Sequence, residues 1–98
     1  MRILCVCDHG SNRSVHVADQ LRFRGHETIP VGVQHLSPET VAMLVDWADR
    51  IILTGAAQRD HFAAKVDGVE LWPLPENPRP YNPDTLRLVR AHIERSGL

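Results

Sequence analysis

The sequence predicts an α/β fold, a single small doubly wound domain over residues 1–98 with a four-stranded parallel sheet and helices on both faces. Three observations predict this class. The chain has 98 residues, which is the size of one domain. Its 43% hydrophobic and 23% charged residues match an ordinary globular protein. Short apolar runs alternate with segments of helical periodicity, which favours parallel strands joined by right-handed crossovers.

The first half of the chain contains two predicted strands, each followed by a helix. Arg2 to Cys7 is a nearly continuous apolar run, which is typical of a buried strand. A helix is expected from Ser14 until Gly25, because glycine is favoured just past a helix end. Glu27 to Val33 is predicted to be the second strand. Ser37-Pro38 then supplies a helix cap followed by proline at the first helical position.

The second half contains two more predicted strands and two more helices. Arg50 to Thr54 is expected to be the third strand, and Ala56 to Val66 the helix after it. Val69 to Leu74 is the fourth predicted strand. The five prolines from Pro73 to Pro83 predict an ordered but irregular loop. Asn82-Pro83-Asp84 has the residues that begin a helix, and an apolar stripe follows it.

Composition excludes several classes of function. A formal net charge of −1 argues against a protein that holds nucleic acid by phosphate neutralisation. The amino end resembles neither a signal peptide nor a membrane span, so no membrane partner is expected. Cys5 and Cys7 are the only cysteines, and strand geometry keeps them from forming a disulfide. We therefore expect a reducing, cytoplasmic setting. The six histidines lack metal-ligand spacing, so no metal site is predicted.

The turn after the first predicted strand carries the chemistry, in the sequence Cys7-Asp8-His9-Gly10-Ser11-Asn12-Arg13-Ser14. Ligands of such sheets bind outside the carboxyl ends of strands. Five residues between Cys7 and Arg13 can wrap backbone N–H groups around a tetrahedral anion, and the helix amino terminus adds positive charge. Arg13 can clamp two oxygens. A thiol in this field is expected to be partly thiolate, the form that attacks phosphorus. The Ser14 hydroxyl can donate to the sulfur or cap the helix.

This motif resembles the signature of the low-molecular-weight protein tyrosine phosphatases, which is Cys, five residues, Arg, Ser near the amino terminus. The weaker similarity of later segments points to a short bacterial or phage-type member. These segments are Leu36-Ser37-Pro38-Glu39, Asp46-Trp47-Ala48-Asp49-Arg50-Ile51-Ile52, Leu74-Pro75-Glu76 and Tyr81-Asn82-Pro83-Asp84.

The resemblance implies a two-step phosphatase that acts on a phosphorylated protein or a small phosphomonoester without a metal or cofactor. Cys7 attacks the phosphate, while Arg13 and the loop from Asp8 to Ser14 hold its oxygens. In the family, an aspartic acid of the later loop protonates the leaving oxygen. Glu76 takes that place when the loops are aligned without gaps, and a positioned carboxylic acid can transfer the proton. Tyr81 either walls a pocket for an aromatic substrate or packs on the loop.

The sequence departs from the family pattern close to the expected chemistry. Asp8 stands where the family residue is usually uncharged, and its carboxylate would repel a phosphate dianion unless it points away. His9 replaces a small residue, and Asn12 stands where many relatives have a second cysteine. Two alternatives to a phosphatase therefore stay open. One is a phosphate-binding or phosphopeptide-binding module with weak catalysis, and the other is a cysteine phosphocarrier, although such carriers have no arginine at the position of Arg13.

Overall fold

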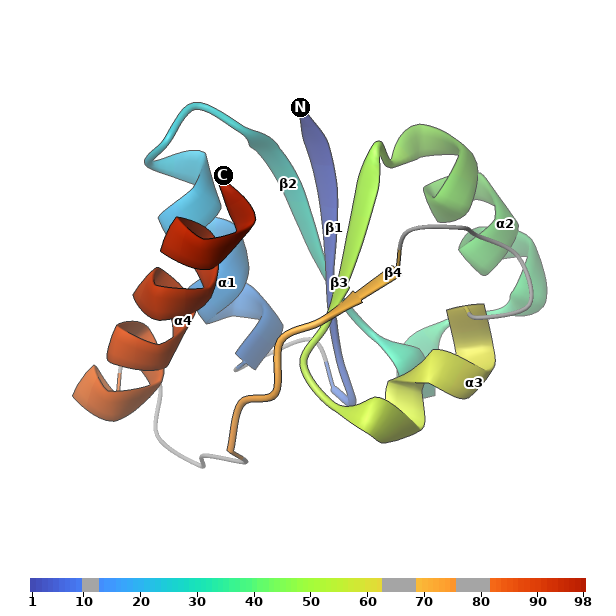
Figure 1. Cartoon of the computed structure of the whole chain (residues 1–98). Helices are drawn as coiled ribbons and strands as arrows, with labels where there is room; N and C mark the ends of the chain where they lie inside the picture. Colours follow the sequence, from blue (N-terminus) through green and yellow to red (C-terminus); the bar gives the residue numbers. More distant parts are fainter. Residues whose placement is uncertain (10–12, 63–68, 76–81) are drawn as a thin grey trace.

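The protein folds around a four-stranded parallel sheet with helices on both faces, as the sequence predicts (Figure 1). The computed structural model describes residues 1–9, 13–62, 69–75 and 82–98. The spatial order of the strands is β2-β1-β3-β4. Their bounds are β1 (Arg2–Cys7), β2 (Glu27–Gly32), β3 (Arg50–Leu53) and β4 (Val69–Leu71). The longer helices are α1 (Arg13–Arg22), α2 (Pro38–Trp47) and α4 (Pro83–Ser96), and the short ones are η1 (Val33–His35), η2 (Ala56–Gln58) and α3 (Arg59–Phe62).

Strand β1 lies in the middle of the sheet and is buried on both faces. It pairs in parallel with β2 on one side and with β3 on the other. Its residues from Ile3 to Cys7 are at most 3% exposed. Because side chains alternate between faces along a strand, Ile3 and Cys5 pack in one core, while Leu4 and Val6 pack in the other. A nearly continuous apolar run is therefore what this position requires.

Two helices cover each face of the sheet (Figure 1). Helices α1 and α4 bury one core, and α2 and α3 lie over the other. Residues of the first core are Ile3, Cys5, Val17, Ala18, Leu21, Ile52, Trp72, Leu74, Val89 and Ile93. Residues of the second are Leu4, Val6, Val33, Val41, Ile51, Leu53 and Phe62. Within the described ranges, no helix is both long enough and apolar enough to cross a bilayer.

The helix ends follow the predicted local chemistry. The Ser37 hydroxyl accepts a hydrogen bond from the Thr40 N–H at 3.2 Å, and Pro38 is the first residue of α2. The Asn82 side-chain oxygen accepts from the Asp84 N–H at 2.8 Å at the start of α4. Gly25 follows α1 with φ of 89°, a left-handed conformation that favours glycine.

Several elements differ from the sequence prediction, since α1 ends at Arg22 instead of reaching Gly25 and β3 ends at Leu53 instead of Thr54. Strand β2 ends at Gly32, because Val33 begins the 3-10 helix η1. Strand β4 ends at Leu71 rather than Leu74, and the chain then passes Pro73, which has no N–H for a regular ladder. The helix expected over 56–66 begins as the 3-10 helix η2 and continues as α3, which the structure describes as far as Phe62. Residues 63–66 lie outside the described part of the chain.

The strand order places one topological switch point between β1 and β3. The crossover from β1 to β2 runs through α1 on one face, whereas the crossover from β2 to β3 runs through α2 on the other face. The chain segments after β1 and β3 therefore leave the carboxyl ends of these adjacent strands toward opposite faces of the sheet. In open α/β sheets this is the position where ligands bind. The segment that follows β1 is the one that begins with Cys7.

Candidate active site

Cys7 is the last residue of β1, and its thiol contacts the first turn of α1. Its Sγ atom lies 3.1 Å from the Ser14 Oγ atom, and both residues are buried. Either atom can donate in this contact. The two ends of the segment from Cys7 to Ser14 are therefore in contact, as the ends of a loop that surrounds an anion must be. The hydroxyl thus contacts the sulfur, which is one of the two positions that the sequence predicts for it.

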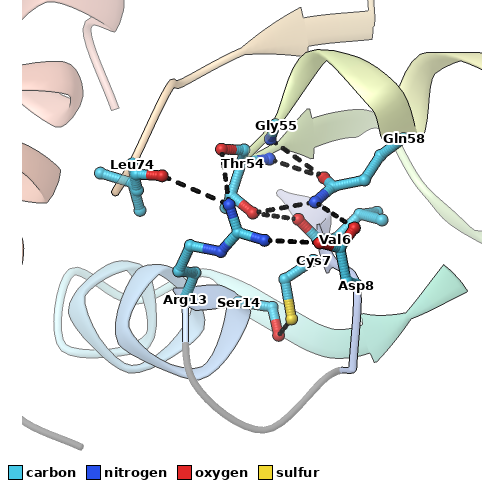
Figure 2. Close-up of polar contacts among 9 residues, drawn as sticks. All are labelled: Val6, Cys7, Asp8, Arg13, Ser14, Thr54, Gly55, Gln58 and Leu74. Atoms are coloured by element: carbon cyan, nitrogen blue, oxygen red, sulfur yellow. Dashed lines mark hydrogen bonds and ion pairs between the residues drawn. The ribbon is translucent and has the colours of Figure 1, made fainter. Parts of the chain in front are cut away.

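Arg13 is the first residue of α1 and is only 9% exposed. Its NH1 group donates to the backbone carbonyl of Leu74 at 3.3 Å and, at the longer distance of 3.5 Å, to that of Thr54. These carbonyls come from the chain after β4 and from the end of β3. A buried guanidinium needs such partners because an unpaired buried cation is costly. They hold Arg13 beside the switch point (Figure 2).

Asp8 forms the third contact of the guanidinium. Its Oδ2 atom lies 3.0 Å from Arg13 NH2, with 32% of the Asp8 side chain and 10% of the Arg13 side chain exposed. The sequence predicts repulsion of an anion by this carboxylate unless it points away. Instead, Asp8 points to the cation that the anion would need. The positive charge of Arg13 is therefore partly neutralised before any ligand binds.

Gln58 organises the other side of the site, and sequence reasoning did not identify it. It is 1% exposed. Its Oε1 atom accepts from the N–H groups of Thr54 at 2.9 Å and Gly55 at 3.2 Å. Its Nε2 atom donates to Asp8 Oδ1 at 3.3 Å. A glutamine in Ala56-Ala57-Gln58-Arg59-Asp60 has the pattern of an exposed helix residue, so no local signal distinguishes it.

Thr54 and Gly55 complete this network at the end of β3 (Figure 2). The Thr54 hydroxyl donates to the Val6 carbonyl at 2.9 Å, which ties the end of β3 to β1. A Cβ atom at Gly55 would lie 3.3 Å from Gln58 Nε2 and 3.5 Å from Arg13 NH1. A Cβ atom would be in ordinary van der Waals contact with Arg13, but the Gln58 amide would have to shift by a few tenths of an ångström to admit it. The extended backbone of Gly55, with φ of −153°, imposes no preference for glycine.

The remaining predicted site residues fall into two groups. His9 is exposed, and its ring centroid lies 6.4 Å from that of His35. Gly10, Ser11, Asn12, Glu76 and Tyr81 lie outside the described residues. The described chain reaches Pro75, so the Leu74 carbonyl that contacts Arg13 is two residues before Glu76 in the sequence.

Cys5 differs from Cys7 in its surroundings, although the two residues are close in sequence. Cys5 is fully buried in the core beneath α1 and α4. Burial raises the pKa of its thiol to about 12, and the nearby charge of Arg22 opposes this only in part. Neither Cys5 nor Cys7 is part of a disulfide within the described residues. The prediction that Cys5 is a core residue is confirmed. Across the described ranges, no three potential metal ligands from His, Cys, Asp or Glu lie together.

Comparisons with models of protein families, with curated proteins and with solved structures found no significant match.

The site thus combines three chemical capacities at one sheet edge. Cys7 supplies a thiol, Arg13 supplies a cation with both terminal nitrogens in hydrogen bonds, and Asp8 supplies a carboxylate that contacts this cation. A tetrahedral oxyanion is the ligand that a helix amino terminus and an arginine recognise together. A sulfur nucleophile beside such an anion can accept a phosphoryl group.

Proposed function

We propose that this protein is a cysteine-dependent phosphatase that hydrolyses phosphomonoesters of the phosphotyrosine type. The observation that carries the proposal is the junction of β1 and α1. The Cys7 thiol at the end of the central strand contacts Ser14, and the residue before Ser14 is the buried Arg13. The resemblance of the Cys7-to-Ser14 motif to the low-molecular-weight protein tyrosine phosphatases supports the same reaction.

The reaction would proceed in two balanced steps. In the first, the Cys7 thiolate forms a sulfur–phosphorus bond as the phosphorus–oxygen bond to the alcohol breaks, and a carboxylic acid gives its proton to the leaving oxygen. In the second, water attacks the phosphorus and gives a proton to the same carboxylate. The sulfur–phosphorus bond then breaks, which restores the thiolate and releases phosphate. Arg13 would stabilise the charge on the phosphoryl oxygens in both steps.

Glu76 is the proposed proton donor. Its support is the sequence similarity of Leu74-Pro75-Glu76 to the family loop, together with the hydrogen bond from Arg13 to the Leu74 carbonyl. That bond brings the chain just before Glu76 to the cation of the site. The substrate class would be a phosphorylated protein or a small phosphomonoester. A thiol nucleophile also fits a reducing compartment, so we propose a cytoplasmic location.

Hydrolysis of para-nitrophenyl phosphate tests this proposal. Cys7→Ser should lower kcat at least about 10³-fold, because a hydroxyl is a far weaker nucleophile than a thiolate. Arg13→Ala should lower kcat/KM by about 10²–10³-fold through loss of oxyanion stabilisation. Glu76→Gln should lower kcat by about 10²–10⁴-fold if Glu76 is the acid.

Two control variants separate these effects from general damage. Cys5→Ala removes a buried thiol that points into the core, and Arg87→Ala removes a cation whose side chain is 76% exposed. Both should keep kcat/KM within about twofold of the wild type. A Cys7→Ser variant that hydrolyses the substrate at the wild-type rate would overturn the proposal.

A phosphate-binding module without efficient catalysis is the second candidate. The observation that favours it is the ion pair between Asp8 and Arg13, which weakens the cation available to a substrate. This candidate predicts that phosphate raises the melting temperature of the wild type but not of Arg13→Ala, because a ligand of the folded state increases stability. It also predicts no turnover of the aryl phosphate.

A further inference from the structure

The Asp8 carboxylate shares a guanidinium nitrogen with any anion that Arg13 binds through NH2. Arg13 NH1 already donates to two carbonyls, and NH2 donates to Asp8 Oδ2 at 3.0 Å. In Figure 2 the guanidinium lies between Leu74 and Asp8, with Cys7 and Ser14 on one side of it. An anion held between Cys7 and Arg13 would therefore have the Asp8 carboxylate as a neighbour.

This carboxylate is held from two sides. Arg13 NH2 binds Oδ2, and Gln58 Nε2 donates to Oδ1 at 3.3 Å. Gln58 is itself fixed by the N–H groups of Thr54 and Gly55. To swing away from an incoming anion, Asp8 would have to break both contacts. An ionised carboxylate can accept about four hydrogen bonds, so these two leave it able to accept more.

A fixed carboxylate beside an oxyanion site distinguishes ligands by their protons. An oxygen without a proton is repelled, since both atoms carry negative charge and neither can donate. A P–OH group can instead donate a hydrogen bond to the carboxylate. A site built to accept a hydrogen bond from its ligand rejects an analogue that lacks the donor.

We propose that Asp8 makes this site selective for oxyanions that carry a proton. Hydrogen phosphate and the monoanion of a phosphomonoester would bind, and sulfate, which has the same shape but no proton near neutral pH, would be rejected. The inference rests on the proposed oxyanion site at Cys7 and Arg13 and names the ionic form of the ligand that this site takes. Asp8 would thus be a specificity-determining residue.

The test is isothermal titration calorimetry of the whole chain near pH 6 at constant ionic strength. Inorganic phosphate is the titrant in one experiment and sulfate in the other. At that pH every phosphate ion carries at least one proton. The wild type should bind phosphate at least about tenfold more tightly than sulfate, because only phosphate can donate to Asp8. Asp8→Asn keeps the size of the side chain, but its one oxygen can accept from either Arg13 or Gln58 and not from both in the present way, and its amide nitrogen can donate to an anion.

Asp8→Asn should therefore bind sulfate at least about tenfold more tightly than the wild type does, with little remaining preference for phosphate. Asp84→Asn is the matched control, because Asp84 has a 76% exposed side chain and pairs with a surface arginine. It should keep the wild-type preference. Circular dichroism checks that Asp8→Asn is folded, and the comparison of the two anions on the wild type needs no variant.

Four results would overturn the inference. Equal affinities of the wild type for phosphate and sulfate would show that Asp8 does not select, and so would an unchanged preference in Asp8→Asn. If neither anion binds although Cys7-dependent hydrolysis of para-nitrophenyl phosphate persists, the proposed selectivity of Asp8 is wrong, but the proposed phosphatase activity stands. If binding and hydrolysis are both absent, the proposed function itself fails.

Discussion

Replacement of Gln58 by leucine tests the network that holds the site together. The change keeps a buried side chain of similar length and removes every polar atom beyond the backbone. It eliminates the bonds from the Thr54 and Gly55 N–H groups at 2.9 Å and 3.2 Å. It also eliminates the longer bonds from Nε2 to Asp8 Oδ1 at 3.3 Å and to Thr54 Oγ1 at 3.4 Å.

The cost can be worked out from the partners that remain. The Thr54 N–H also donates to the Val6 carbonyl at 3.0 Å, so it keeps a partner. The Gly55 N–H loses the only acceptor that the described residues give it, which costs about 1 kcal/mol because Gly55 is only half-buried and water can reach part of it. The other lost bonds add about 1 kcal/mol, and the apolar leucine offsets part of the sum. We expect Gln58→Leu to lower the free energy of unfolding by about 1–2 kcal/mol.

Urea denaturation measures this change against the control Gln34→Leu. The Gln34 side chain is exposed, so its replacement should stay within about 0.5 kcal/mol of the wild type. Gln58→Leu should also release Asp8 from one of its two anchors and weaken the preference for phosphate over sulfate. If Gln58→Leu unfolds at the same urea concentration as Gln34→Leu, the amide does not hold the end of β3 and the reasoning is refuted.

Two further predictions concern titratable side chains. In native protein treated with iodoacetamide near neutral pH, Cys5 should be alkylated at least about tenfold more slowly than Cys7, because burial raises the pKa of the Cys5 thiol to about 12. Peptide mass mapping measures the two alkylation rates. Faster alkylation of Cys5 than of Cys7 would contradict the prediction. Burial and, secondarily, Arg95 lower the pKa of His92, whose ring stacks on Trp72 at 5.4 Å. Because the unfolded state then binds the proton more readily, the stability from neutral His92 is complete above about pH 6.5 and declines as the pH falls through the lowered pKa. His92→Phe should flatten that decline in urea titrations at several pH values, and an unchanged slope would contradict the assignment.

The fold was predictable because its signals are local. The apolar run of β1 indicates a strand buried on both faces, and Ser37-Pro38 and Gly25 mark helix ends by capping chemistry. Strand β4 was predicted too long, because Trp72 and Leu74 still donate to the carbonyls of Leu53 and Thr54, on either side of a proline that cannot donate.

The site was predictable only where one segment carries it. Cys7, Arg13 and Ser14 are close in sequence, and their spacing indicates an anion loop. The carbonyls that Arg13 contacts belong to Thr54 and Leu74, which follow two other strands, and Gln58 donates to Asp8, which lies 50 positions earlier in the chain. Such contacts leave no local pattern. The sequence raised the question of where Asp8 points, and only the three-dimensional arrangement answers it.

The most direct test of the account is to locate the phosphoryl group during turnover. The protein is mixed with para-nitrophenyl phosphate, quenched within one turnover and digested for peptide mass mapping. The account predicts one added phosphoryl group on the amino-terminal peptide, present in Cys5→Ala and absent in Cys7→Ser. A phosphoryl group that persists in Cys7→Ser, or hydrolysis with no phosphorylated peptide at any quench time, would contradict the role of Cys7 as the nucleophile.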